Sequence, residues 1–341
     1  MPMRSRLLAR LKGDADSELS AFARTRLRLL NLFHTMPQPP RKRPGFKSKQ
    51  SWQGGHGPRR DDQGQGNAAR FSSGPKPPGK PAFARKSGQE QGWDQVAGWY
   101  DKLVGDKGSD YHRNVILPAA MRLLAPKAGE KVLDLCCGQG VLIPLLLEAK
   151  VGRVTGVDAS PRLIESASAR FRDEKRVELV VADACAPGPW ADGSNDAAAC
   201  IMAVHDVPDL PAMARQVAAA LKPGGRFVAI FMHPCFRIPQ QAHWGWDEGR
   251  KLQYRRVDRY GVPQEIPIVT HPGQGGGDTT TFYHRPVGEV LTAFGQAGLA
   301  ITVCEELFSH RRSQPGPRAK GENRAVKEFP VFLAVSCVRL P

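Results

Sequence analysis

The stretch Val132-Leu-Asp-Leu-Cys-Cys-Gly-Gln-Gly140 decides the fold of this chain of 341 residues. Residues 131–135 form a short apolar run that is typical of a buried parallel strand. Gly138 and Gly140 end this run just before a new apolar periodicity begins at Val141. We therefore expect a strand, a tight turn and the start of a helix. Glycines let the backbone turn sharply and let a ligand approach it, and the free N–H groups of the helix start attract polar or anionic groups.

Two kinds of nucleotide site compete for this loop. The dinucleotide pattern Gly-x-Gly-x-x-Gly needs a third glycine at position 143, where the chain has isoleucine. Asp134, four residues before Gly138, would repel a pyrophosphate and would suit a ligand with a cationic amino group. Asp158 ends the next apolar run at the distance expected of a ribose-binding acid. An α/β turn that binds no ligand is the remaining alternative.

From about Trp93 to Leu340 the chain resembles the class I S-adenosylmethionine-dependent methyltransferases, in particular the small-molecule group that includes quinone-biosynthesis enzymes. Four linked motifs carry the resemblance: the Asp134 loop, the strand end at Asp158, the pair Asp183-Ala184 and the turn Leu-Lys-Pro-Gly-Gly at 221–225. The resemblance implies that S-adenosyl-L-methionine is the cofactor and that its methyl group passes to an O, N or C nucleophile. Cys136 departs from the family pattern, because many relatives have glycine there.

The resemblance also implies which residues hold the cofactor. The two glycines would admit its methionine part, and Asp134 would support its ammonium region. Asp158 would accept hydrogen bonds from both ribose hydroxyls, and Asp183 would bind the adenine amino group. The predicted cofactor-binding residues are Tyr100, Asp134, Cys136, Gly138, Gly140, Asp158, Ala159, Asp183, Ala184, Met202 and Ala203.

Apolar runs and helical patterns alternate along the rest of this region. The predicted strands are 131–135, 153–158, 177–182, 197–202, 226–232, 301–308 and 329–338, and the predicted helices are 93–101, 115–124, 141–150, 160–173, 211–221 and 286–297. Parallel neighbours require right-handed crossovers, so helices cover both faces. The expected fold is an α/β, Rossmann-like sheet of seven mostly parallel strands, and the family resemblance adds an antiparallel C-terminal hairpin.

Regular patterning fails between Pro234 and Tyr283, and a long connection of this kind is usually functional or disordered. Its aromatic residues are too many for a solvated linker, so we predict a substrate-covering lid at 234–283 whose part 273–278 is mobile. A second irregular segment, the basic loop at 310–327, separates the last two strands.

Methyl transfer depends mainly on positioning, and a general base is needed only if the acceptor carries a proton. His205, His233 and His284 follow or precede predicted elements at the expected substrate position, and each could be a base or a structural histidine. Arg285 could instead hold an acidic acceptor. The Asn/Asp-Pro-Pro-Tyr motif for methylating exocyclic amines is absent, and Cys235 lacks the partner motif of cytosine C5 methylation.

The net charge of +16 belongs almost wholly to the N-terminal segment. Residues 1–92 contain 19 Lys/Arg and 6 Asp/Glu, a net charge of +13, which leaves +3 for residues 93–341. Residues 1–36 could form short amphipathic helices or a targeting segment, and 37–92 are too poor in aliphatic residues to fold. We therefore divide the chain into a basic, largely disordered extension, 1–92, and a methyltransferase domain, 93–341. The extension could bind RNA or another polyanion weakly, or serve as a solubilising tail.

Seven cysteines in irregular positions indicate reduced thiols rather than a disulfide framework or a metal site. No apolar run is long enough to span a membrane, so we expect a cytoplasmic enzyme.

Three functions fit the sequence. The leading hypothesis is methyl transfer to a small molecule. The second is methylation of RNA or a ribosomal protein that the basic extension delivers, and this activity would fall at high salt. The third is a non-catalytic protein that binds both the cofactor and nucleic acid.

Overall fold

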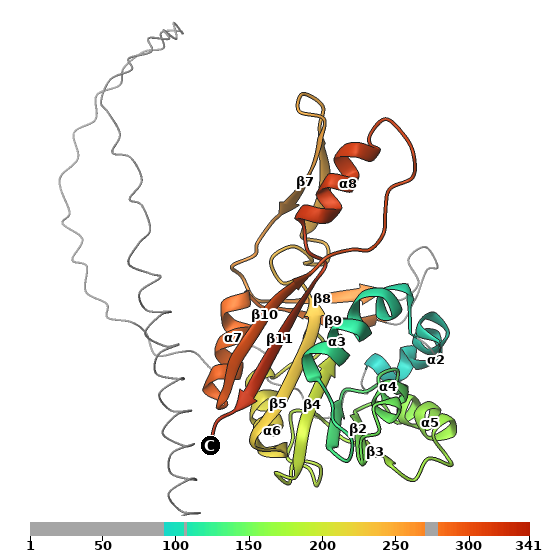
Figure 1. The fold of residues 1–341 in the computed structure, drawn as a ribbon. Helices are drawn as coiled ribbons and strands as arrows, with labels where there is room; N and C mark the ends of the chain where they lie inside the picture. Colours follow the sequence, from blue (N-terminus) through green and yellow to red (C-terminus); the bar gives the residue numbers. More distant parts are fainter. Residues whose placement is uncertain (1–91, 106–107, 270–278) are drawn as a thin grey trace, which may run out of the picture. The chain divides into compact units, whose positions relative to one another are not determined.

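The computed structural model describes residues 92–105, 108–269 and 279–341 (Figure 1). All of them belong to one compact unit, Gly74–Pro341. The predicted basic extension, up to residue 91, and the predicted mobile part of the lid lie outside the described residues. The division of the chain at residue 92 stays a prediction.

A seven-stranded sheet forms the centre of the domain, in the order β10-β11-β5-β4-β1-β2-β3. Strands β1 to β5 are mutually parallel, whereas β11 is antiparallel to both β5 and β10. The strands are β1 Lys131–Leu135, β2 Arg153–Asp158, β3 Val177–Val181, β4 Asn195–Ile201, β5 Leu221–Met232, β10 Leu299–Leu307 and β11 Phe332–Arg339. The predicted fold class, including the C-terminal hairpin, is confirmed.

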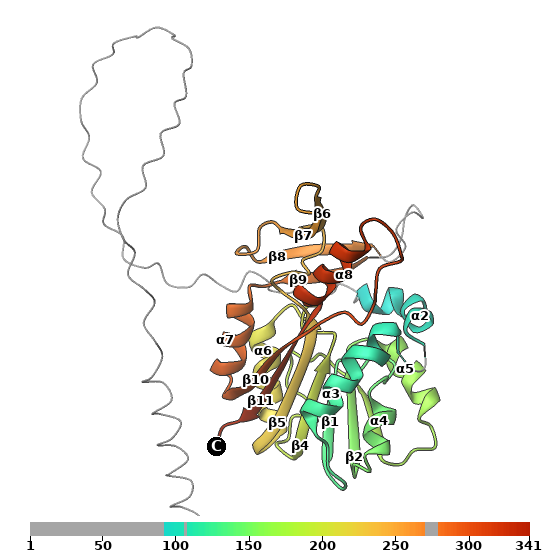
Figure 2. The ribbon, with the colours of Figure 1, turned by 45° about the horizontal axis from the view of Figure 1, so that its top comes forward.

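Helices cover both faces of this sheet (Figure 2). In β5, Phe227 and Ala229 pack into the core shared with α6 and α7, whereas Val228 and Ile230 pack into the core shared with α3 and α4. This alternation arises because successive side chains of a strand point to opposite faces, so a sheet buried on both faces is apolar throughout. The helices around it are α2 Gly92–Val104, a π-helical turn His112–Ile116, α3 Leu117–Leu124, α4 Ile143–Glu148, α5 Pro161–Arg170, α6 Leu210–Ala220 and α7 Val287–Gln296.

Two helices begin at capped residues that the sequence indicates. The hydroxyl of Ser160 accepts a hydrogen bond from the N–H of Leu163, and Pro161 occupies the first turn of α5. Asp209 caps α6 in the same way by accepting from the N–H of Ala212.

Two predicted loops are regular elements in the structure. The predicted turn at 221–225 lies inside β5, where the pairing with β4 shifts register. Asn195 pairs with Leu221, and Ala197 pairs with Arg226. The basic loop at 310–327 contains helix α8, Ala319–Glu328. Gly321 lets α8 pack closely on the lid, since a Cβ there would meet the carbonyl of Lys251 at 2.7 Å.

The predicted lid contains two antiparallel hairpins, which the sequence pattern did not reveal. The first pairs β6 Ala242–Asp247 with β7 Leu252–Val257, and the second pairs β8 Gln264–Val269 with β9 Thr279–His284. Both lie beyond the carboxyl ends of the parallel strands (Figure 1). A small separate core under them contains Ile238, Ile266 and Phe282. Such short, half-exposed strands have weak hydrophobic patterning, so they could not be predicted from the sequence.

Candidate functional site

A cavity of about 760 Å³ lies between the carboxyl edge of the sheet and the hairpins. Chain order reverses between β1 and β4, since β2 and β3 extend to one side and β5 to the other. Ligands of open α/β sheets bind at this kind of switch point, outside the carboxyl ends of the strands. The cavity therefore occupies the position that the fold predicts for a ligand.

Ten of the eleven predicted cofactor-binding residues line this cavity: Tyr100, Asp134, Cys136, Gly138, Asp158, Ala159, Asp183, Ala184, Met202 and Ala203. Gly140 does not. Its φ of +81° favours glycine, and a Cβ there would meet Phe171 at 2.8 Å and Ile143 at 2.9 Å. The structure thus gives Gly140 a role in turning and packing the loop, and its ligand contact stays a prediction.

The loop after β1 has a backbone that explains its composition. Gly138 has a φ of +55° and Cys136 a φ of +57°, both in the left-handed region. A glycine would adopt this conformation without strain at position 136, where many relatives have glycine. Cys136 adopts it in this chain. A Cβ at Gly138 would lie 3.7 Å from the ring of Tyr100 on α2, so the ring covers the loop closely.

Asp158 organises the loop from the end of β2. Its Oδ2 accepts a hydrogen bond from the N–H of Gly138 and its Oδ1 from the N–H of Ser160, each at 2.9 Å. A carboxylate offers about four lone pairs, so acceptor capacity remains on both oxygens. Burial raises the pKa of Asp158, and these backbone hydrogen bonds oppose the shift.

Helix α2 is attached to α5 beside this loop. The carboxylate of Asp94 accepts hydrogen bonds from Ser160 Oγ at 2.9 Å and from the N–H of Arg162 at 3.1 Å. Trp93 packs edge-on against Tyr100, with ring centroids 5.1 Å apart. Asp94 therefore holds the aromatic cover of the cavity in place.

Asp134 is the most buried acid of the cavity, with 2% of its surface exposed. Burial, followed by the charge of Asp158, raises its pKa to about 7. Among the described residues its Oδ2 has no hydrogen-bond partner. A buried carboxylate oxygen without a donor is costly, so this atom suits a cationic or hydrogen-bonding group of a ligand.

Asp206 is a further acid that the motifs missed. It follows β4, lines the cavity, and its pKa is raised well above the usual value by burial and by Asp158. Its only signal in the sequence is its place in Ala203-Val-His-Asp206, after a predicted strand. Four acids line the cavity at the strand ends: Asp134, Asp158, Asp183 and Asp206. We call these four residues the acidic wall.

His205 is the one predicted catalytic histidine that lines the cavity. Its ring packs on Phe282 with centroids 4.8 Å apart, and its Nε2 lies 3.9 Å from Oδ2 of Asp206. Burial, followed by the charge of Arg285, lowers its pKa to about 3. Its buried Nδ1 has no hydrogen-bond partner among the described residues. A neutral imidazole with a free ring nitrogen can accept a proton.

The structure does not bring His233 or His284 to the cavity. His233 is buried and lies 3.2 Å from Glu306 through Nε2, while its Nδ1 accepts from the N–H of Cys235. His284 Nε2 donates to the carbonyl of Tyr260 at 2.8 Å. Both side chains fasten the chain on either side of the lid, so the prediction that they are catalytic has no geometric support.

Arg285 does not line the cavity either. Its guanidinium is buried and donates to the carbonyls of Val207 at 2.8 Å and Pro208 at 2.7 Å. It therefore fastens the end of β9 to the loop that follows β4.

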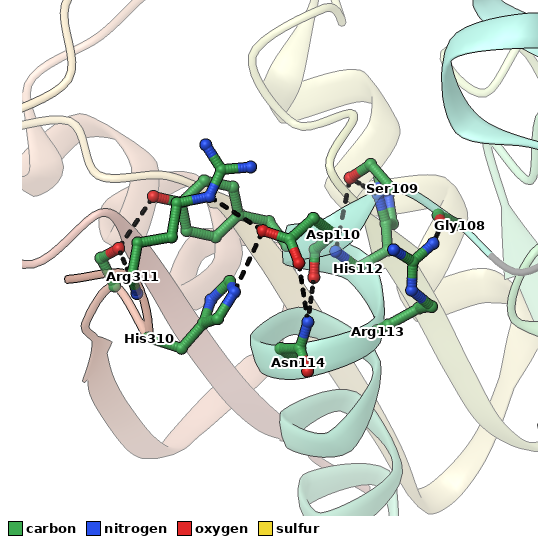
Figure 3. Close-up of polar contacts among 10 residues, drawn as sticks. Gly108, Ser109, Asp110, His112, Arg113, Asn114, His310 and Arg311 are labelled. Carbon is green, nitrogen blue, oxygen red and sulfur yellow. Dashed lines mark hydrogen bonds and ion pairs between the residues drawn. The ribbon is translucent and has the colours of Figure 1, made fainter. Parts of the chain in front are cut away.

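A polar cluster where the chain enters the π-helical turn positions one more histidine of the cavity wall (Figure 3). Asp110 binds His310 at 3.0 Å and Arg311 at 2.8 Å, which joins this segment to the loop after β10. Next to it, Ser109 Oγ lies 2.8 Å from Nδ1 of His112. Burial lowers the pKa of His112 to about 4, so it is neutral near pH 7.

Residues of the lid complete the cavity and were not singled out by sequence. Ile238, Ile268 and Phe282 supply apolar surface, and Arg237 and Arg255 supply positive charge. No motif marks these residues, because they come from the segment after β5 and from strands that the pattern did not predict.

Comparison with known proteins identifies the family. A family model described as a methyltransferase domain matches residues 132–225. A 2-phytyl-1,4-naphtoquinone methyltransferase of Synechococcus elongatus is 37% identical over 163 residues, which make up 44% of this chain and 68% of the relative. A Nostoc protein of the same name is 30% identical over 190 residues, 52% of this chain and 79% of the relative. The crystal structure of an S-adenosylmethionine dependent methyltransferase from Mesorhizobium loti has a TM-score of 0.51 and 30% identity, and the match covers 65% of this chain and 96% of that chain.

The chain belongs to the class I S-adenosylmethionine-dependent methyltransferases.

S-adenosylmethionine is the cofactor of this methyltransferase, and the cavity fits it. The unpartnered Oδ2 of Asp134 suits a group that is positively charged or donates hydrogen bonds, and this cofactor has an ammonium group. Gly138 and Cys136 line the cavity, and Asp158 keeps acceptor capacity for hydroxyl groups.

Within the described ranges, no group of His, Cys, Asp or Glu side chains is placed to hold a metal ion. In that same part of the chain, no helix has the length and apolar character needed to cross a bilayer. All seven cysteines are free thiols.

Proposed function

We propose that the enzyme methylates a small molecule that binds under the two hairpins. The observation that carries this proposal is the composition of the cavity. It continues from the acidic wall into a region lined by Ile238, Ile268 and Phe282. Cavities that enclose small molecules are predominantly apolar with a few placed polar groups. The cyanobacterial relatives are named for a naphthoquinone, which is also a small molecule.

The roles of the cofactor-binding residues come from the family resemblance and are part of the proposal. Asp158 would bind the ribose hydroxyls and Asp183 the adenine amino group. Asp134 would support the ammonium region next to Gly138 and Cys136, and Tyr100 would cover it. When bound, S-adenosylmethionine supplies an electrophilic methyl group on a sulfonium.

The chain then contributes positioning and exclusion of water. The hairpins and α2 enclose the acceptor region, and a closed site that holds the acceptor in line can supply most of the rate. We assign His205 as the group that takes the proton of the acceptor. It lines the cavity, and its buried Nδ1 has no hydrogen-bond partner among the described residues. Asp206, 3.9 Å from its Nε2, would help to orient the ring.

The proposal is tested by incubating the full-length protein with S-adenosylmethionine labelled on its methyl group. A cell extract is divided beforehand into small molecules, RNA and protein, and each fraction is offered separately. We expect label in the small-molecule fraction. Label confined to RNA or protein, or no transfer despite cofactor binding, would overturn the proposal.

Replacing His205 by glutamine should lower kcat by a factor of roughly 100 or more, which is the usual contribution of a general base. Cofactor affinity, measured by calorimetry, should stay nearly unchanged. The matched control is His243→Gln, because His243 is exposed on β6 and does not line the cavity. A kcat of wild-type size in the His205 variant would remove this residue from the mechanism.

A further inference from the structure

Two arginines line the cavity on the side of the lid. Arg237 lies in a tight turn after β5, and its backbone N–H donates to the carbonyl of His233 at 2.8 Å. Arg255 lies on β7, with its guanidinium 4.8 Å from the ring of Trp244 and its Nε donating to the carbonyl of Phe236 at 2.9 Å. The backbone turn and the stacked indole hold both side chains at the cavity wall.

Neither guanidinium has a carboxylate partner among the described residues. Burial lowers the pKa of Arg237, and Tyr111 is the group whose charge raises it. Burial also lowers the pKa of Arg255, and so does the positive charge of Arg237. The two cations are thus close enough to repel each other. A partly buried pair of like charges is unfavourable unless an anion compensates it.

The charges of the cavity are divided between its two sides. The acidic wall comes from the ends of β1 to β4, whereas the arginines come from the segment after β5 and from β7. The charges that raise the pKa values of Asp134 and Asp206 come from Asp158, and neither arginine is among the groups that lower them. The cavity therefore has one side suited to a cation and another side suited to an anion.

We propose that the acceptor carries an anionic group, a carboxylate or a phosphate, which Arg237 and Arg255 bind on the lid side of the cavity. This inference rests on the proposed function, because it describes the small molecule that the enzyme methylates. The apolar side chains Ile238 and Ile268 line the same cavity, so the acceptor combines an apolar body with an acidic group.

The chemistry of arginine suits this task. A guanidinium is planar, stays charged, and can give two parallel hydrogen bonds to one carboxylate or phosphate. Arg255 uses Nε for the carbonyl of Phe236, so its terminal nitrogens remain for the ligand. An anion held there would fix the orientation of the acceptor relative to the acidic wall, which is the positioning that methyl transfer needs.

The test uses the full-length enzyme and a small-molecule extract from which RNA and protein have been removed. The extract is divided by anion exchange into a retained, anionic part and an unretained part before it meets the enzyme and labelled S-adenosylmethionine. We expect the label in acceptors of the anionic part. Labelling confined to the unretained part would overturn the anionic acceptor and leave the proposed function intact. No labelling of either part, with label in RNA or protein or nowhere, would overturn the proposed function itself.

Variants then test whether the two arginines bind the anionic group of the acceptor. Loss of a charge-assisted hydrogen bond costs roughly 1.5–3 kcal/mol, so Arg237→Gln should raise KM for the anionic acceptor at least about tenfold with a smaller effect on kcat. Arg237→Lys should recover part of this loss, because it keeps the charge without the planar fork.

Arg256→Gln is the matched control. Arg256 neighbours Arg255 but is exposed, points to the opposite face of β7 and pairs with Asp258. It should behave as the wild type. Cofactor affinity serves as the check on folding, and Arg237→Gln should retain it. An unchanged KM in Arg237→Gln, or an equal increase in Arg256→Gln, would overturn the assignment of the anion to these residues.

Discussion

Asp134 places a carboxyl group inside the sheet with one oxygen lacking a partner among the described residues. Its pKa rises from 3.8 to about 7 on folding. Between these two pH values the folded protein keeps a proton that the unfolded chain has lost, so the stability of the protein without cofactor falls as pH rises. The difference of about 3 units corresponds to roughly 4 kcal/mol at and above pH 7.

Asp134→Asn should remove this pH dependence, because the amide does not ionise. Denaturant titrations at several pH values should show the variant gaining stability relative to the wild type as pH rises from about 4 to 7. Its affinity for S-adenosylmethionine should fall at the same time. Asp173→Asn, an exposed acid after α5, is the control and should change neither property. A constant stability difference across this pH range would contradict the argument.

Single residues differed in how far the sequence revealed them. Residues inside the strand-end motifs, such as Asp158 and Asp183, were found because the parallel sheet brings strand ends to one edge. Gly140 was assigned to the ligand because its motif includes it, yet the space beside it is filled by Phe171. No sequence motif marks Arg237 as a binding residue, because its place at the cavity depends on a lid strand more than ten residues away.

At the level of elements, α2 depends on Asp94 for its attachment over the cavity. Asp94→Asn should weaken the contacts with Ser160 and Arg162 and lower cofactor affinity about fivefold, the effect of losing roughly 1 kcal/mol of hydrogen bonding. Hydrogen exchange in α2 should speed up. Glu165→Gln is the control, since Glu165 is exposed on α5. Unchanged exchange and affinity in Asp94→Asn would show that α2 needs no such attachment.

Elements also show where sequence patterns lose information. Strands β1, β4 and β5 are buried on both faces and read as continuous apolar runs, so their place was predicted to within a few residues. The lid strands alternate between partly buried and exposed residues and contain Trp244 and Tyr254, both exposed, so composition indicated a lid without its hairpins. Helix α8 was not predicted, because its packing depends on two small buried residues, Gly321 and Ala325.

For the whole molecule, the distribution of charge leads to a test that requires no mutation. Residues 93–341 carry a net charge of +3, and the cavity lies between the sheet and the hairpins. A small acceptor bound inside meets charges that salt screens only weakly. By contrast, a nucleic acid held by the strongly basic residues 1–92 would release many counterions on binding.

Turnover of the small acceptor by the full-length enzyme should therefore change by less than roughly threefold when salt is raised from low to physiological concentration. Binding that neutralises several phosphates would weaken by a factor of about 1000 or more over a similar interval. The measurement is kcat/KM as a function of salt, with cofactor affinity recorded in parallel to separate effects on the two ligands. A steep decline in kcat/KM at constant cofactor affinity would contradict an acceptor that binds inside the cavity.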